Sequence, residues 1–169
     1  HRTEYRICPS RTRRHFMELC IVILNYKTPN LVLDCLDTLH GQVDGESRRV
    51  IVVDNNSPDN SESAITQGIE SRQYGGWVDF LKSKENGGFA AGNNLGAGAI
   101  TASNYLLLNS DTLVRPGTIS TLLETLRQNP RAGIVGPRLE WPDGTPQISC
   151  FRDHSPWSDP NACLYGCWN

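Results

Sequence analysis

Residues 18–30 read ELCIVILNYKTPN, and this stretch decides the fold. The apolar run from Leu19 to Leu24 is rich in isoleucine and valine, which is typical of a strand buried on both faces. Thr28 and Pro29 then predict the start of a helix, because proline is favoured in the first helical turn. A buried strand that leads directly into a helix is the unit from which parallel α/β sheets are built.

The same alternation of strand and helix continues toward the C-terminus. Further strands are predicted over residues 49–54, 77–81 and 105–108, and further helices over 61–71 and from Gly87 to about residue 102. This order predicts an α/β fold with a Rossmann-like, mostly parallel sheet and helices on both faces.

The pattern weakens in the last third of the chain. Pro116 predicts the start of another helix, and Ile134-Val135 predicts the start of a fifth strand. Pro142-Asp143-Gly144 is a strong turn signal and is expected to form the tip of a hairpin. Neither helical nor strand periodicity is visible after about residue 150.

The length and charge of the chain limit the classes of protein to consider. A chain of 169 residues suits one domain, and its net charge of −2 gives no general attraction to nucleic acid. Residues 1–16 are arginine-rich and are expected to be a disordered basic head, 17–158 the domain, and 159–169 an irregular tail. No apolar run is long enough to span a membrane, and no apolar stretch typical of a secretory signal follows the basic head. We therefore expect a cytoplasmic protein and leave peripheral membrane association open.

Polar residues stand where three of the predicted strands end. Ligands of parallel α/β sheets bind beyond the carboxyl ends of the strands, where Asn25, Asp54 and Asn109-Ser110-Asp111 fall. The Asp111 carboxylate is suited to a hard divalent cation that bridges two phosphates. Asp54 is suited to accept a hydrogen bond from a pyrimidine N–H. Asp and Asn also end strands simply by making turns, and that alternative stays open at both places.

Residues 86–96 form a second distinctive stretch, NGGFAAGNNLG. Gly88, Gly92 and Gly96 recur every four residues, so they share one face of the predicted helix and allow close approach of the sheet or of a ligand. The start of this helix also offers free N–H groups to an anion. Packing of the helix on the sheet is the alternative explanation of the glycines.

Taken in order, these segments resemble the family 2 glycosyltransferases of the GT-A fold, with a rhamnosyltransferase-like subset as the nearest match. The pieces that carry the resemblance are Ile21–Tyr26, Val52–Ser57, Asn86–Gly96, Leu106–Thr112 and Gly133–Leu139 followed by Pro142-Asp143-Gly144. The resemblance covers Glu18 to Trp157. It implies a transferase that binds a nucleotide-diphosphate sugar.

The resemblance also implies a role for individual residues. Asn25 and Tyr26 would lie against the base and ribose, and Asp54 would bind the pyrimidine ring. Asp111 matches the last aspartate of the family's metal-binding motif, which implies Mg or Mn as the cofactor. The residues expected to line the nucleotide-sugar pocket besides these are Asn56, Asn86, Gly87, Gly88, Asn94 and Asn109. Asn109 replaces the first aspartate of the motif, which leaves one carboxylate instead of two.

The implied reaction is inverting transfer from a UDP- or dTDP-linked sugar to a carbohydrate or lipid-linked acceptor, as in cell-surface polysaccharide synthesis. The general base of this reaction is assigned to no residue, because Asp153 and Asp159 come too early in the chain. We therefore keep a second hypothesis, a non-catalytic nucleotide-sugar-binding fragment truncated at its C-terminus. A sugar-nucleotide nucleotidyltransferase is disfavoured, because residues 25–29 are not a glycine-rich basic loop.

Overall fold

The computed structural model describes residues 17–147 of the chain. The predictions for the basic head (1–16) and the irregular tail (159–169) lie outside these residues. The chain divides into two units, residues 1–117 and 118–169, and each is described by itself.

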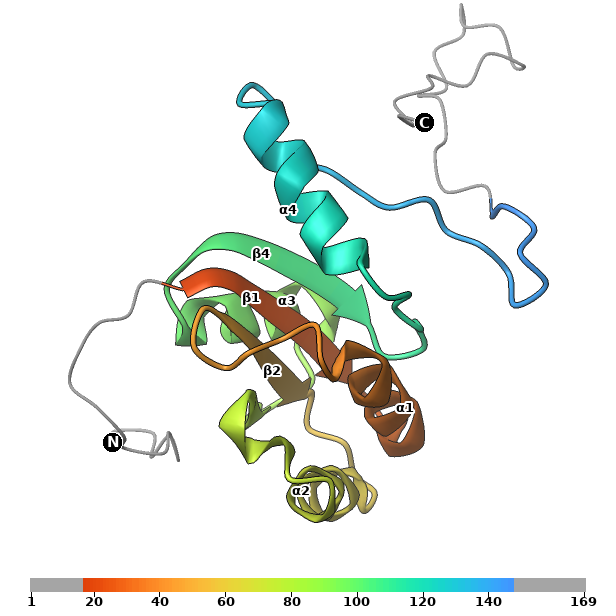
Figure 1. Ribbon diagram of the computed structural model, residues 1–169. Helices are drawn as coiled ribbons and strands as arrows, with labels where there is room; N and C mark the ends of the chain where they lie inside the picture. The colour runs from red at the N-terminus through yellow and green to blue at the C-terminus, as the bar shows by residue number, and fades with distance from the viewer. Residues whose placement is uncertain (1–16, 148–169) are drawn as a thin grey trace, which may run out of the picture. The chain divides into compact units, whose positions relative to one another are not determined.

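The first unit is built on a sheet of four parallel strands in the order β3-β2-β1-β4 (Figure 1). The strands are β1 (Met17–Asn25), β2 (Arg48–Asp54), β3 (Val78–Lys82) and β4 (Ala102–Asn109). All four predicted strands are confirmed. β4 begins three residues earlier than its apolar run, because Ala102 to Asn104 pair with the start of β1.

Helices cover both faces of this sheet, as predicted. They are α1 (Pro29–Leu39), α2 (Ser61–Ser71) and α3 (Gly88–Ala99), with a short 3-10 turn at Tyr74–Gly76. α3 packs against β1 and β2 on one face, whereas α1 and α2 pack against each other on the opposite face (Figure 1). None of the helices within residues 17–147 combines the length and the apolar character needed to cross a membrane.

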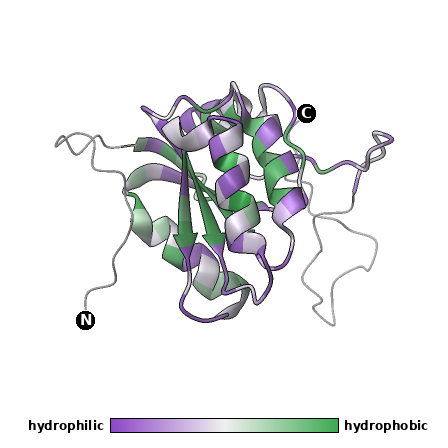
Figure 2. Ribbon diagram, turned by 90° about the horizontal axis from the view of Figure 1, so that it is seen from below, coloured by the Kyte–Doolittle hydropathy of each residue, from purple (hydrophilic) through white to green (hydrophobic). Residues whose placement is uncertain are grey.

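The core follows from the alternation of side chains along buried strands. Cys20 and Val22 of β1 cluster with Ile51 and Val53 of β2 on the face covered by α3. The intervening residues point to the other face and are also fully buried; they include Ile21, Ile23, Val50 and Val52. Figure 2 shows these strands as hydrophobic along their length. Each buried side chain of this size contributes roughly 1.5–3 kcal/mol relative to exposure.

Packing of α3 on the sheet explains two of the three glycines that recur every four residues in this helix. A Cβ at Gly96 would stand 2.5 Å from Val22 Cγ1, and one at Gly92 would stand 2.3 Å from Leu24 Cδ1. Gly88 differs, because a Cβ there would meet nothing within 4 Å, but its φ of +80° favours glycine. The alternative explanation, helix-on-sheet packing, is therefore correct for Gly92 and Gly96.

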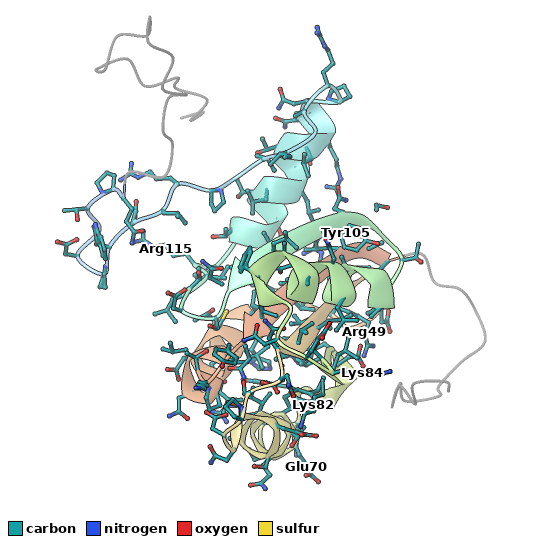
Figure 3. The ribbon with its side chains drawn as sticks, turned by 180° about the vertical axis from the view of Figure 1, so that it is seen from behind. Arg49, Glu70, Lys82, Lys84, Tyr105 and Arg115 are labelled. Atoms are coloured by element: carbon teal, nitrogen blue, oxygen red, sulfur yellow. The ribbon has the colours of Figure 1, made fainter. Side chains whose placement is uncertain are left out.

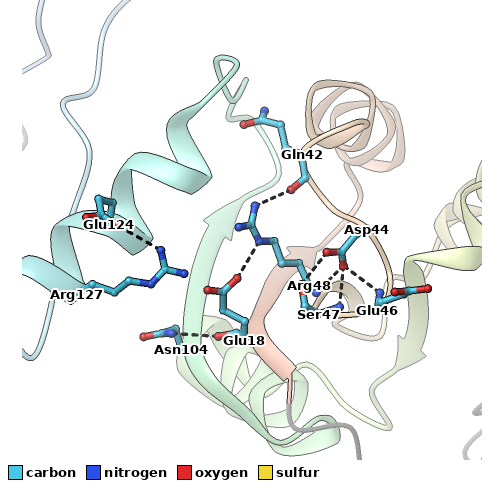
Figure 4. Close-up of polar contacts among 9 residues, drawn as sticks. All are labelled: Glu18, Gln42, Asp44, Glu46, Ser47, Arg48, Asn104, Glu124 and Arg127. Atoms are coloured by element: carbon cyan, nitrogen blue, oxygen red, sulfur yellow. Dashed lines mark hydrogen bonds and ion pairs between the residues drawn. The ribbon is translucent and has the colours of Figure 1, made fainter.

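Near the amino ends of β1 and β2, charged side chains form hydrogen bonds that link the two strands and the loop before β2 (Figure 4). The Arg48 guanidinium donates to Glu18 Oε2 over 3.1 Å and to the Gln42 carbonyl over 3.4 Å. Asp44 Oδ1 accepts the backbone N–H groups of Glu46, Ser47 and Arg48 at 2.8–2.9 Å. Burial opposes ionisation of Asp44, but these hydrogen bonds and one from the Ser47 hydroxyl outweigh it and lower the pKa to about 2.

In the second unit, α4 (Thr118–Gln128) begins two residues after Pro116, because Gly117 adopts a φ of +82°. The prediction of a fifth strand from Ile134 is wrong. Residues 134–139 form no strand, and Ile134 is 93% exposed. A strand needs a hydrogen-bonding partner along its length, whereas the pairing seen within residues 118–147 begins only at Leu139, whose carbonyl accepts the Gln147 N–H. The predicted hairpin tip is confirmed by the bridge between Glu140 and Pro146 and by the turn at residues 142–144.

Candidate functional site

The carboxyl ends of three strands meet at one edge of the sheet. Asn25, the last residue of β1, is paired in register with Asp54, the last residue of β2. On the other side of β1, Leu24 is paired with Asn109, the last residue of β4. The structure therefore brings together the polar strand ends that the sequence predicted as a site.

Asn25 and Asp54 form a buried hydrogen-bond network with Ser57. The Asn25 amide donates to Asp54 Oδ1 at 2.7 Å and to Ser57 Oγ at 3.2 Å. The Ser57 hydroxyl donates to Asp54 Oδ1 at 2.6 Å, and its backbone N–H donates to Oδ2 at 3.1 Å. Sequence reasoning missed Ser57, although a hydroxyl three residues after a strand-ending carboxylate is a common turn signal.

This network bears on the predicted roles of Asn25 and Asp54. Both side chains are fully buried, and both carboxylate oxygens of Asp54 already accept hydrogen bonds. Oδ2 could accept one more hydrogen bond, but the side chain is fully buried, so direct contact with a base would require the residues that cover Asp54 to move. That predicted role stays a prediction, while the observed one is to fix the ends of β1 and β2 to each other.

Asn55 joins β2 to the glycine-rich stretch and was also missed. Its side-chain amide donates to Asn86 Oδ1 at 2.8 Å and to the Gly88 carbonyl at 3.3 Å. Asn86 Oδ1 also accepts the Gly88 N–H at 3.0 Å, so the three residues hold one another. The side-chain oxygen of Asn55 is buried and has no hydrogen-bond partner among the described residues. A buried acceptor without a partner is unfavourable by about 1–3 kcal/mol, so it calls for a ligand or a water.

The remaining residues predicted to bind the nucleotide sugar are exposed. Tyr26 is 43% exposed, and the Lys27 ammonium lies 5.1 Å from the centre of its ring. Asn56 is exposed with a φ of +57°. Gly87 is exposed before α3, and Asn94 is exposed within it, next to the buried Asn93. Their surfaces are open to a ligand.

The segment after β4 presents a carboxylate to solvent. Asp111 is exposed, and the Asn109 carbonyl accepts the Thr112 N–H at 3.1 Å in a turn. The Ser110 hydroxyl lies 3.2 Å from the Thr28 hydroxyl at the start of α1. Burial, and to a smaller extent the nearby negative charge of Asp111, raise the pKa of the Cys35 thiol to about 12. Asp111 therefore lies near α1.

Comparison with known proteins identifies this arrangement. Residues 20–158 match the family described as glycosyl transferase family 2. The chain belongs to this glycosyltransferase family. The match confirms the resemblance at the level of the family and extends over most of the chain.

Solved structures agree with the family 2 fold. One is a mannosyltransferase from Pyrobaculum calidifontis in complex with GDP-Man and Mn²⁺, with a TM-score of 0.62 and 18% identity over 83% of this chain. Another is residues 1–349 of TarS from S. aureus in complex with UDP-GlcNAc, with a TM-score of 0.56 and 18% identity over 66% of this chain. These likenesses confirm the GT-A fold. The chain spans 40% and 32% of those two chains, and no curated protein matches it.

The exposed oxygen-bearing side chains at and after the end of β4 have the chemistry that suits a cation shared with a substrate. Within residues 17–147, no three His, Cys, Asp or Glu side chains gather closely enough to hold a metal by themselves. Mg²⁺ sites, however, commonly use one or two carboxylates together with substrate phosphates and water. Asp111 and the side-chain oxygen of Asn109 suit that arrangement, because both residues are exposed at the end of β4.

Proposed function

We propose that this chain forms the donor site of an inverting glycosyltransferase that uses a UDP- or dTDP-linked sugar. The acceptor would be a carbohydrate or a lipid-linked carbohydrate, as in cell-surface polysaccharide synthesis. One observation carries the proposal: within a family 2 domain, polar strand ends meet at one edge, with the exposed Asp111 after β4 and the buried, unpartnered Asn55 oxygen after β2.

The nucleotide would bind at the ends of β1 and β2. Uracil and thymine each carry an imide N–H, which is a donor suited to the unpartnered oxygen of Asn55, provided that the residues covering this buried oxygen move aside when the base binds. Tyr26 and Asn56 offer exposed surface beside it for the base and ribose. Asn25 and Asp54 would shape this end of the site through their own hydrogen bonds, instead of by the direct contacts that the sequence suggested.

The diphosphate would bind between the start of α3 and the end of β4. The N-terminus of α3 after Gly87 offers free N–H groups to a phosphate, and Asn86 and Asn94 lie close to it in sequence. Asp111 and Asn109 would hold Mg²⁺ or Mn²⁺, which when bound neutralises the charge of the departing diphosphate. The mannosyltransferase neighbour is in complex with both GDP-Man and Mn²⁺, which supports the use of a divalent cation together with a nucleotide sugar.

Inverting transfer also needs a base that takes the proton of the acceptor hydroxyl, and we assign that role to no residue of this chain. The resemblance of Leu106–Thr112 to the rhamnosyltransferase-like subset supports testing a dTDP-linked donor first. Location in the cytoplasm, with or without peripheral membrane association, is part of the same proposal.

The test is calorimetric titration of the full chain with UDP, dTDP and GDP, each with and without manganese. We expect one pyrimidine nucleotide to bind more tightly with manganese, and Asp111→Ala to lower that affinity by at least about tenfold, or roughly 1.4 kcal/mol. Glu70→Ala is the matched control, because Glu70 is exposed on α2, well away from Arg115 of the Asp111 segment (Figure 3). Absence of binding by the folded wild-type chain would refute the proposal.

A further inference from the structure

The segment that carries Asp111, residues 110–117, is hydrogen-bonded to residues at both ends of α1. The Ser110 hydroxyl lies 3.2 Å from Thr28 Oγ1, just before the helix. In the last turn of α1, Thr38 Oγ1 accepts a hydrogen bond from the Val114 N–H at 3.0 Å. The Gly117 N–H donates to Gln42 Oε1 at 3.1 Å, just after the helix. The segment is therefore anchored near both ends of α1.

The first of these contacts has a defined direction. The Asn25 amide nitrogen donates to Asp54, so the Asn25 side-chain oxygen is an acceptor. Thr28 Oγ1 donates its proton to that oxygen at 3.2 Å. Since a hydroxyl has one proton to give, Ser110 must be the donor to Thr28. Hydrogen bonds thus run from the residue beside Asp111 to the buried carboxylate of Asp54.

The hydrogen bond between Val114 and Thr38 also involves a side chain that is held in place. The Thr38 hydroxyl donates to the Cys35 carbonyl at 2.7 Å, which orients its lone pairs toward the Val114 N–H. α1 itself is rigidly packed, because Val32, Cys35, Leu36 and Leu39 are fully buried. Asp111 and Leu113, in contrast, are exposed. The backbone of the segment is thus fixed to α1 at Val114, whose side chain is buried, while the side chains of Asp111 and Leu113 are exposed.

We propose that Thr28 and Thr38 are positioning residues for Asp111. Their hydroxyls hold residues 110–117 on α1, so that the Asp111 carboxylate is already in place when a cation and a diphosphate bind. Holding a segment in its binding conformation strengthens binding by reducing the entropy lost on association. This inference rests on the proposed donor site and adds two residues to it.

The experiment compares Thr28→Val and Thr38→Val with the wild-type full chain, since valine keeps the shape of threonine and removes the hydroxyl. The first readout is the ratio of the nucleotide dissociation constants without and with manganese. We expect each substitution to reduce this ratio by about five- to tenfold, while the manganese-free constant changes by less than about twofold. The second readout is amide hydrogen exchange without ligand, in which Thr38→Val is expected to speed exchange at Val114 by about tenfold.

Conservative and matched variants separate positioning from general damage. Thr28→Ser and Thr38→Ser keep the hydroxyl and are expected to restore the manganese ratio. Thr66→Val removes a hydroxyl that donates to the Glu62 carbonyl on α2 at 2.8 Å, and it should change neither readout. If a valine variant fails to fold, Ser110→Ala breaks the Thr28 contact from the other side and is expected to lower the ratio as Thr28→Val does.

The outcomes also separate this inference from the proposed function. An unchanged manganese ratio in folded Thr28→Val and Thr38→Val overturns the positioning role, whether or not hydrogen exchange accelerates. A wild-type chain that shows no manganese-dependent nucleotide binding overturns the proposed donor site and this inference with it. A ratio lowered by valine and restored by serine supports both.

Discussion

The side-chain amide of Asn25 donates a hydrogen bond of 2.7 Å to Asp54 Oδ1, between the last residues of two neighbouring parallel strands. Both side chains are fully buried. A buried carboxylate is tolerated only where hydrogen bonds replace the water it has lost, and here Asn25 and Ser57 provide them. Hydrogen bonds between buried side chains therefore hold the ends of β1 and β2 in place at the edge of the sheet that carries the candidate site.

Asp54→Asn is expected to destabilise the chain by about 2–3 kcal/mol. The new amide group would place its own N–H donors among donors from Asn25 and Ser57, where the structure needs acceptors. Urea denaturation followed by circular dichroism measures the loss. The control Glu70→Gln changes an exposed carboxylate on α2 and should stay within about 0.5 kcal/mol of wild type. An equally small effect of Asp54→Asn would contradict this account of the network.

Gly96→Ala and Gly98→Ala are expected to act in opposite directions. A Cβ at Gly96 would lie 2.5 Å from Val22 Cγ1 and 2.9 Å from Val53 Cγ2, and valine side chains are too stiff to move aside easily. We expect a net loss of about 1–2 kcal/mol at Gly96. A Cβ at Gly98 would meet nothing within 4 Å, so alanine there should add roughly 0.5–1 kcal/mol by favouring the helix. Thermal and urea denaturation measure the change in the free energy of unfolding for each variant. If both substitutions change this free energy in the same direction, the prediction is wrong.

The strands and helices of the first unit could be predicted because each has a strong local pattern. Six apolar residues from Leu19 to Leu24 predict β1 wherever its partners lie. The fifth strand at Ile134 was wrong for the converse reason, because two β-branched residues do not make a strand without a partner. Local pattern thus determines whether a segment is suited to a strand, and pairing determines whether the strand forms.

The location of the candidate site could be predicted from the sequence, whereas the hydrogen bonds between its residues could not. The position of Asn25, Asp54 and Asn109 at strand ends follows from the sequence alone. The pairing of Asn25 with Asp54 depends on the register of β1 against β2, which no single segment encodes. The unpartnered oxygen of Asn55 likewise depends on where Asn86 and Gly88 lie, more than 30 residues away along the chain. Contacts of this kind become visible only in three dimensions.

Asn55→Ala is expected to loosen the start of α3 and weaken nucleotide binding. It removes the amide that holds Asn86 Oδ1 and the Gly88 carbonyl, and it removes the buried unpartnered oxygen. We expect about 1 kcal/mol of destabilisation and a fall of about tenfold in nucleotide affinity. Hydrogen exchange over residues 86–88 and calorimetry measure the two effects. Asn60→Ala is the control, because Asn60 is exposed before α2 and its side chain makes no capping bond. An unchanged nucleotide affinity in Asn55→Ala would exclude a role of Asn55 in nucleotide binding.

The contribution of Asp44 to stability is expected to depend on pH. Its folded-state pKa of about 2 lies below the ordinary value of 3.8, so its contribution is present above about pH 4 and is lost as the pH falls toward about 2. The side chain is exposed, and solvent screening limits the effect of Asp44→Ala to about 1 kcal/mol at pH 7. Urea denaturation at pH 7, 5 and 3 should give equal differences from wild type at the first two values and a smaller one at pH 3. A difference at pH 3 that is equal to or larger than the one at pH 5 would show that the pKa is not lowered.

The two described cysteines are expected to resist alkylation while the chain is folded. Burial is the main cause that raises the pKa of Cys20 to about 11 and that of Cys35 to about 12. At pH 8 only about one thiol in a thousand at Cys20, and one in ten thousand at Cys35, would be the reactive thiolate. Both side chains are also fully buried, so a reagent reaches them only when the core opens. Peptide mapping after treatment with iodoacetamide should find both unmodified in buffer and both modified in urea. Rapid labelling of Cys35 in buffer would mean that α1 opens readily, and a helix that opens readily would be a poor anchor for the segment carrying Asp111.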